Sequence, residues 1–106
     1  MMTAQQYILC KLAEEANEVA QRALKAQQFG IEQTEPGKSQ DNGERLESEL
    51  LDLMFWMDIA IRNNVLAPMD TEDFHGHRRT KLPEAFKMLL LALSEGQLVP
   101  SDSIEL

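Results

Sequence analysis

The sequence predicts an all-α protein, a small helical bundle that is completed by dimerisation. Three observations lead to this prediction. Residues 3–28 and 44–62 contain neither glycine nor proline, are rich in good helix formers, and repeat their apolar residues at helical spacing. A third stretch, from Pro83 to Gly96, is rich in leucine. No run shows the alternation of apolar and polar residues that is typical of a strand.

Length and charge set the outer limits on organisation and function. With 106 residues the chain is expected to form a single domain over residues 1–96, followed by a flexible tail over residues 97–106. The 18 acidic residues outnumber the 10 lysines and arginines, which gives a net charge of −8. This charge disfavours a nucleic acid or an anionic membrane as partner and is compatible with binding divalent cations.

Cysteine usage and hydropathy indicate the compartment. Cys10 is the single cysteine, so no disulfide within the chain is expected. No apolar run reaches the roughly 18 to 20 residues that span a bilayer. The first residues also lack the charged and apolar regions of a secretory signal. We therefore expect a soluble, cytoplasmic protein.

The first helix is expected from Thr3, a candidate N-cap, to the region before Gly30, a candidate stop. Ile8 and Val19 belong to an apolar stripe at helical spacing. Glu15 interrupts this stripe, being seven residues from Ile8 and four from Val19. An acid in that position is unusual because a surface helix normally keeps its acids on the opposite face.

The other elements follow from breakers and capping residues. Residues 30–43 hold Pro36 and three glycines and are expected to form a polar connection, too long for a tight hairpin. Asp41 and Glu44 form a candidate capping box for a second helix that ends near Arg62. After a short basic element at residues 74–81, Pro83 is expected in the first turn of a separate helix that stops at Gly96.

The central part of the second helix carries an acid in apolar surroundings. Seven of the eight residues from Leu50 to Met57 are apolar, and the exception is Asp52. A carboxylate there costs several kcal/mol or changes its pKa, unless a cation or hydrogen-bond donors meet it. Glu49 lies three residues earlier and shares a helix face with Asp52.

Placed side by side, the two acidic helices would supply four carboxylates. Their like charges repel one another unless a cation is present, and ligation by oxygen alone favours Mg²⁺ or Mn²⁺. Because Mg²⁺ takes part of its coordination shell from phosphates, the cluster suggests phosphate chemistry on a nucleotide. The four residues are Glu15, Glu18, Glu49 and Asp52.

These residues carry a resemblance to a known family. Residues 14–18 (EEANE) and 49–52 (ELLD) resemble the paired Glu-x-x-Glu and Glu-x-x-Asp signature of the all-α nucleoside triphosphate pyrophosphohydrolases. This is the MazG-like superfamily, which also includes the dimeric dUTPases. The resemblance covers residues 8–60, about half of the chain. It implies a MazG-like four-helix core. Since two long helices with wide apolar faces make half of such a core, we expect a homodimer, or a dimer of dimers, with active sites near the subunit interface.

The resemblance also implies a reaction. Water would attack a nucleoside triphosphate between the α- and β-phosphates and release the monophosphate and pyrophosphate. The metal ligands would be Glu15, Glu18, Glu49 and Asp52, and either Glu14 or Glu18 would accept the proton of the attacking water. Mg²⁺ in this position would neutralise the triphosphate and activate the water.

Candidate substrate-binding residues lie outside the acidic motifs. Arg78, Arg79 and Lys81 match the family's distal basic pattern loosely and would hold the departing pyrophosphate, with a solvated helix end as the competing interpretation. Trp56 is a candidate for stacking on the base, with a core or interface position as its alternative. His75 and His77 do not share a helix face, which disfavours a zinc site.

Other functions compete with the enzyme. Glu14 and Glu18 could lie on a solvated helix face, and the chain could then be a non-catalytic helical module for dimerisation that retains an acidic cluster binding metal or nucleotide. A di-iron carboxylate bundle also has inward-facing acids, but it normally carries Glu-x-x-His pairs. The one such pair here, Glu72 with His75, lies outside the acidic helices, so this alternative ranks last.

Overall fold

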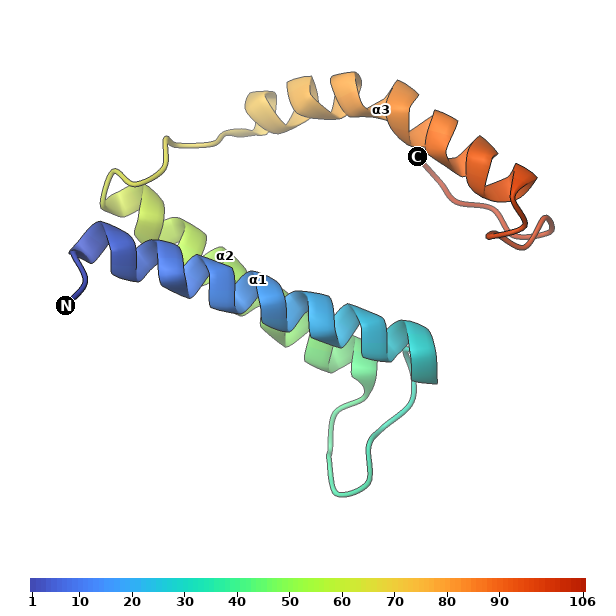
Figure 1. The fold of residues 1–106 in the computed structure, drawn as a ribbon, viewed down its shortest axis with the longest axis horizontal. Helices are drawn as coiled ribbons and strands as arrows, with labels where there is room; N and C mark the ends of the chain where they lie inside the picture. The colour runs from blue at the N-terminus through green and yellow to red at the C-terminus, as the bar shows by residue number, and fades with distance from the viewer. The chain divides into compact units, whose positions relative to one another are not determined.

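The computed structural model describes all 106 residues and contains three helices and no strands (Figure 1). The helices are α1 (Ala4–Phe29), α2 (Asn42–Arg62) and α3 (Thr71–Ser94). The all-α prediction is confirmed, whereas the four-helix core and the dimer stay predictions. The chain divides into two compact units, Met1–Pro68 and Met69–Leu106. The single domain over residues 1–96, with its tail, also stays a prediction.

None of the three helices is long and apolar enough to cross a membrane.

Helix α1 begins and ends where its capping residues predict. The Gln6 backbone N–H donates to the Thr3 hydroxyl at 3.1 Å, and the Thr3 N–H donates to the Gln6 side chain at 3.0 Å. This reciprocal capping box satisfies amide groups that have no partner inside the helix. At the other end Gly30 has a φ of 102°, in the region that glycine enters without strain, and its N–H donates to the Ala26 carbonyl.

Helix α2 packs against α1 as the second arm of an antiparallel hairpin (Figure 1). Its capping box is the predicted one, with the Glu44 N–H donating to the Asp41 carboxylate at 2.8 Å. The connection is tied to this end of α2, because the Gly43 N–H donates to the Ile31 carbonyl at 2.8 Å. A Cβ atom at position 43 would lie only 2.9 Å from Cγ1 of Ile31, so any other residue there would force Ile31 to shift.

The hairpin buries few of its apolar side chains. Ile8 on α1 and Ala60 on α2 are the two buried hydrophobic residues of the chain. Trp56 is half-buried near them, with its ring packed edge-on against Tyr7 at 6.1 Å and Phe55 at 5.5 Å between centroids. The hairpin alone therefore has no closed hydrophobic core.

Helix α3 corrects one prediction. Asp70 is its N-cap, in a capping box with Asp73, but the helix then runs unbroken to Ser94 with Pro83 inside it. The prediction of a separate helix with Pro83 in its first turn is therefore wrong. Proline removes one N–H bond, to the Arg79 carbonyl four residues earlier. Pro83 is exposed, so water can satisfy that carbonyl and the helix continues.

Most of the large apolar side chains of α3 stay exposed, and the helix has no buried residue. After the helix, residues 97–106 form turns and extended chain without a further helix. The Arg78 guanidinium donates a hydrogen bond to the backbone carbonyl of Leu106 within this unit. The exposed large apolar residues of α3 are Phe74, Phe86, Met88, Leu90, Leu91 and Leu93.

Candidate functional site

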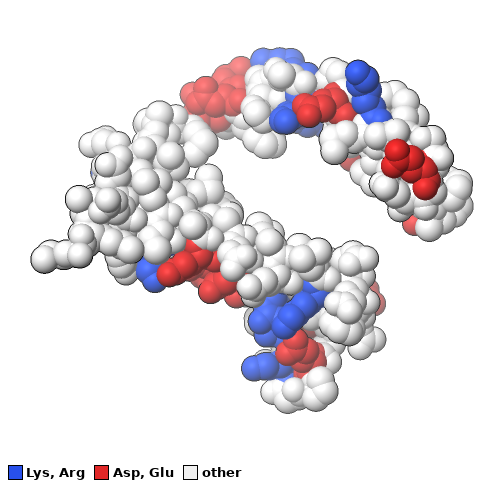
Figure 2. All heavy atoms as spheres, viewed as in Figure 1, with Lys and Arg blue, Asp and Glu red and all other residues white.

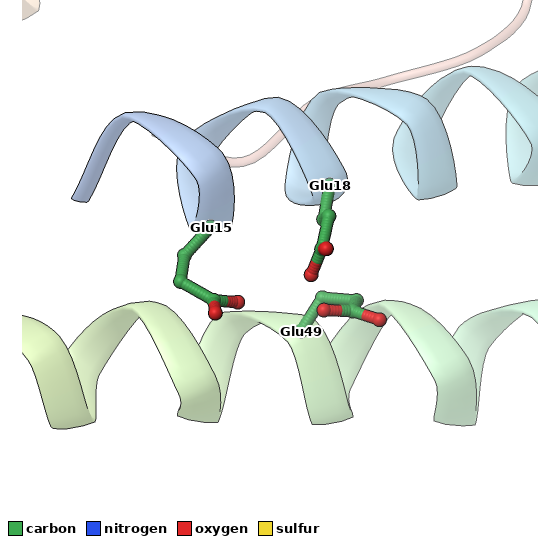
Figure 3. A group of neighbouring side chains, drawn as sticks. All are labelled: Glu15, Glu18 and Glu49. Atoms are coloured by element: carbon green, nitrogen blue, oxygen red, sulfur yellow. The ribbon is translucent and has the colours of Figure 1, made fainter. Parts of the chain in front are cut away.

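Three acidic side chains converge between the arms of the hairpin. Glu15 and Glu18 extend from α1 toward α2, where Glu49 meets them (Figure 3). One carboxylate oxygen from each of the three lies within 4.8 Å of the others. We call this group the acidic trio. Its members come together because residues 15 and 18 share one face of α1 and the antiparallel α2 presents residue 49 to that face.

The acidic trio is electrostatically unfavourable without a counter-charge. Oε2 of Glu15 and Oε2 of Glu49 are shielded from solvent and have no hydrogen-bond partner. Desolvation, followed by the negative charge of Glu18, raises the pKa of Glu15 above its ordinary value. Desolvation also raises the pKa of Glu49, and Glu18 adds to the effect. The fold therefore holds two carboxylates where ionisation is penalised.

The two other predicted acids differ in position from the trio. Asp52 is exposed and is not a member of the trio, although its charge contributes to the raised pKa of both Glu15 and Glu49. Glu14 is also exposed, and its Oε2 pairs with Nζ of Lys11 at 3.1 Å. Asp52 thus borders the trio, whereas Glu14 is neutralised by a neighbour on its own helix.

The predicted basic residues all lie on α3, in the unit formed by residues 69–106. Lys81 pairs through Nζ with Oε2 of Glu84 at 3.2 Å, and Arg78 binds the chain end. The structure therefore gives these two basic side chains local partners on their own unit. Arg79 is exposed on the same helix.

Trp56 lies four residues beyond Asp52 on α2, one helical turn farther from the loop. Its ring packs edge-on against Tyr7, whose ring in turn has Nζ of Lys11 5.6 Å from its centroid. An aromatic group thus borders the acidic residues on one side along the hairpin.

The donor set of the acidic trio suits a hard divalent cation. Carboxylate oxygens are ligands that Mg²⁺ and Mn²⁺ accept, and two of these oxygens lack any other partner. Acidic side chains also cluster on helix surfaces without an ion.

No protein-family model, curated protein or solved structure matches this chain.

The structure also reveals a charged group that the sequence analysis missed. Arg22, Lys25 and Arg45 surround the carboxylate of Glu35, which belongs to the loop between α1 and α2. A sequence signal exists for two of them. Arg22 comes four residues after Glu18 and Arg45 four residues before Glu49, so an antiparallel pair of helices brings both arginines to the same side of the acids. The loop glutamate gives no comparable signal.

Proposed function

We propose that this chain is a Mg²⁺-dependent nucleoside triphosphate pyrophosphohydrolase of the MazG-like type. It would cleave NTP or dNTP between the α- and β-phosphates into the monophosphate and pyrophosphate. The observation that supports this most is the convergence of Glu15, Glu18 and Glu49 from two helices, with two shielded carboxylate oxygens that have no partner. The paired acidic motifs described above supply the reaction class.

In this proposal Glu15, Glu18 and Glu49 hold the cation, and Asp52 completes the ligand set from the border of the trio. When bound, Mg²⁺ supplies charge neutralisation of the triphosphate and activation of the attacking water. Either Glu14, which is paired with Lys11, or Glu18 would accept the proton of the attacking water.

Trp56, with Tyr7 packed against its ring, is the proposed contact for the base, because Trp56 lies one helical turn from Asp52 on α2. We also propose that Arg78, Arg79 and Lys81 bind the leaving pyrophosphate. Those residues would contribute from a partner subunit.

We further propose a homodimer, or a dimer of dimers, in a cytoplasmic setting. A chain with two buried hydrophobic residues leaves most of its large apolar side chains in water, and a second copy would cover them. The free thiol of Cys10 suits a reducing compartment. Light scattering at micromolar concentration tests the assembly, and a stable monomer would contradict it.

The deciding experiment measures pyrophosphate release from a panel of standard and modified NTPs and dNTPs, with Mg²⁺ or Mn²⁺. Glu49→Gln and Asp52→Asn remove one negative charge each, and Glu47→Gln on the same helix is the matched control because Glu47 is exposed. Metal-dependent monophosphate production that is lost in the first two variants and kept in the control is the expected result.

The alternative is a non-catalytic helical module for dimerisation. It gains support from the many apolar side chains that the single chain leaves exposed. If no nucleotide is turned over while the protein is folded and dimeric, the alternative replaces the enzyme.

A further inference from the structure

A second charged group lies on the same hairpin, next to the acidic trio on the side of the loop. Arg22 and Lys25 of α1 and Arg45 of α2 form it, and we call it the basic cluster. All three pair with one carboxylate, that of Glu35. Oε2 of Glu35 lies 3.0 Å from Nη1 of Arg45, and Oε1 lies 3.6 Å from Nζ of Lys25 and 3.9 Å from Nη1 of Arg22. Figure 2 shows acidic and basic atoms following one another along this hairpin toward its loop.

The basic cluster holds more positive charge than its single carboxylate can satisfy. The side chains of Arg45 and Arg22 are only 15% and 22% exposed, so water solvates them poorly. Nη1 of Arg22 is shielded from solvent and has no hydrogen-bond partner, because Glu35 at 3.9 Å is too far away. Within the basic cluster three cations around one carboxylate leave an excess of two positive charges, part of which the acidic trio one helical turn away offsets. A second anionic group can pair with these cations directly.

Glu35 can leave the basic cluster without dismantling the hairpin. The loop is anchored by hydrogen bonds to the start of α2 from Ile31 and Gln33, whose carbonyls accept the N–H groups of Gly43 and Asn42 at 2.8 and 2.9 Å. Glu35 lies beyond both anchors, and its side chain is 40% exposed. The ion pair with Arg45 holds the pKa of Glu35 below its ordinary value, so the group is an anion at neutral pH.

We infer that the basic cluster is a polyphosphate-binding site, which takes the terminal phosphates of a nucleoside triphosphate or free pyrophosphate and which the Glu35 carboxylate occupies until the ligand displaces it. Phosphate oxygens match both the charge and the hydrogen-bonding pattern of two guanidinium groups. The inference rests on the proposed function only in naming a nucleotide as the carrier of those phosphates.

The spacing fits such a ligand. Arg22 follows Glu18 by four residues and Arg45 precedes Glu49 by four, so the basic cluster begins about 6 Å from the acidic trio along the helix axes. A triphosphate bound at the trio would then extend toward the loop. Its nucleoside would lie on the opposite side, where Trp56 and Tyr7 pack together.

Calorimetric titration with inorganic pyrophosphate, in the absence of divalent metal and at low ionic strength, tests the site directly. Glu35→Gln removes the competing charge, and Glu32→Gln is its matched control, an exposed acid in the same loop with no ion pair. We expect Glu35→Gln to bind pyrophosphate roughly threefold to tenfold more tightly than the natural protein, and Glu32→Gln to bind like it.

Variants that remove a positive charge from the basic cluster test the site in the opposite direction. Arg45→Gln is expected to weaken pyrophosphate binding roughly tenfold. The control is Arg62→Gln, on the same helix, where the arginine pairs with Asp58 far from the cluster in sequence. Arg22→Gln repeats the test if Arg45→Gln lowers the helix content measured by circular dichroism.

A comparison of nucleotides with pyrophosphate shows whether the ligand is a nucleoside triphosphate or free pyrophosphate. A non-hydrolysable nucleoside triphosphate should show the same order of variants as pyrophosphate, whereas a nucleoside monophosphate should not distinguish Glu35→Gln from the natural protein. If pyrophosphate alone shows the order, the site is one for free pyrophosphate.

Other outcomes overturn the inference. If Glu35→Gln lowers the unfolding temperature and leaves pyrophosphate binding as in Glu32→Gln, Glu35 is merely a structural tie. If Arg45→Gln and Arg62→Gln weaken binding equally, the attraction is non-specific. A protein that hydrolyses nucleotides with an unchanged KM in Arg45→Gln refutes this site and keeps the proposed enzyme. Conversely, pyrophosphate binding that follows the expected order without any turnover keeps the site and refutes the enzyme.

Discussion

Replacing Glu49 by glutamine should stabilise the metal-free protein. The change keeps the shape of the side chain and removes a charge that lies within 4.8 Å of two other carboxylates. At the 4.8 Å separation, two unit charges repel by about 0.9 kcal/mol even at the dielectric constant of water, about 80. Removing the repulsion from two neighbours should therefore raise the free energy of unfolding by about 1 to 2 kcal/mol at low ionic strength, and salt reduces this gain. The raised pKa of Glu49 agrees with the sign of this effect.

Thermal unfolding followed by circular dichroism measures this gain in stability. In a domain of this size about 1 kcal/mol changes the unfolding temperature by about 4 to 8 °C. Glu47→Gln is the control, because it removes the same charge from an exposed position on the same helix. Added Mg²⁺ should stabilise the natural protein more than Glu49→Gln, since a ligand that binds the folded state raises its stability. A Glu49→Gln protein that is no more stable than Glu47→Gln would refute the repulsion within the acidic trio.

Three further predictions follow from local geometry. Because the pKa of Glu35 is lowered, its ion pairs stabilise the fold at pH values above the ordinary pKa of 4.5, and this contribution is lost as the pH falls below 4.5 through the folded pKa. The free energy of urea unfolding of Glu35→Gln should therefore differ from that of the natural protein at pH 7 and converge with it in acid. Gly43→Ala should lower the free energy of unfolding by about 1 kcal/mol, because its Cβ would contact Ile31 at 2.9 Å. Gly76→Ala should instead raise the helix content of α3 and its stability by about 0.5 to 1 kcal/mol, because the nearest atom to its Cβ is the flexible end of Arg79 at 3.7 Å, and a loss of stability there would contradict this.

The helices and most of their ends could be predicted because they depend on neighbours along the chain. Each capping box joins residues three positions apart, and Thr3 and Asp41 cap their helices as predicted. Gly30 ends α1 because its own backbone conformation is one that glycine enters without strain. The sequence does not predict that α3 continues through Pro83, because the cost of the unpaired carbonyl depends on its exposure to water, which the sequence does not state.

The sequence predicts a group of four acids, and the structure brings three of them together. Periodicity places Glu15 and Glu18 on one face of α1, and Glu49 and Asp52 on one face of α2. The hairpin brings Glu49 into the acidic trio and leaves Asp52 exposed at its border. That difference depends on how far one helix is shifted along the other, which the sequence does not state.

The all-helical chain, the caps at Thr3 and Asp41 and the placing of acids within apolar stripes can all be deduced from the amino-acid sequence, because each depends on residues within one or two helical turns. The meeting of Glu15, Glu18 and Glu49, and the pairing of Glu35 with cations from both helices, depend instead on the tertiary structure. Such contacts join side chains that are 10 or more residues apart, and the packing of α1 on α2 brings them within reach.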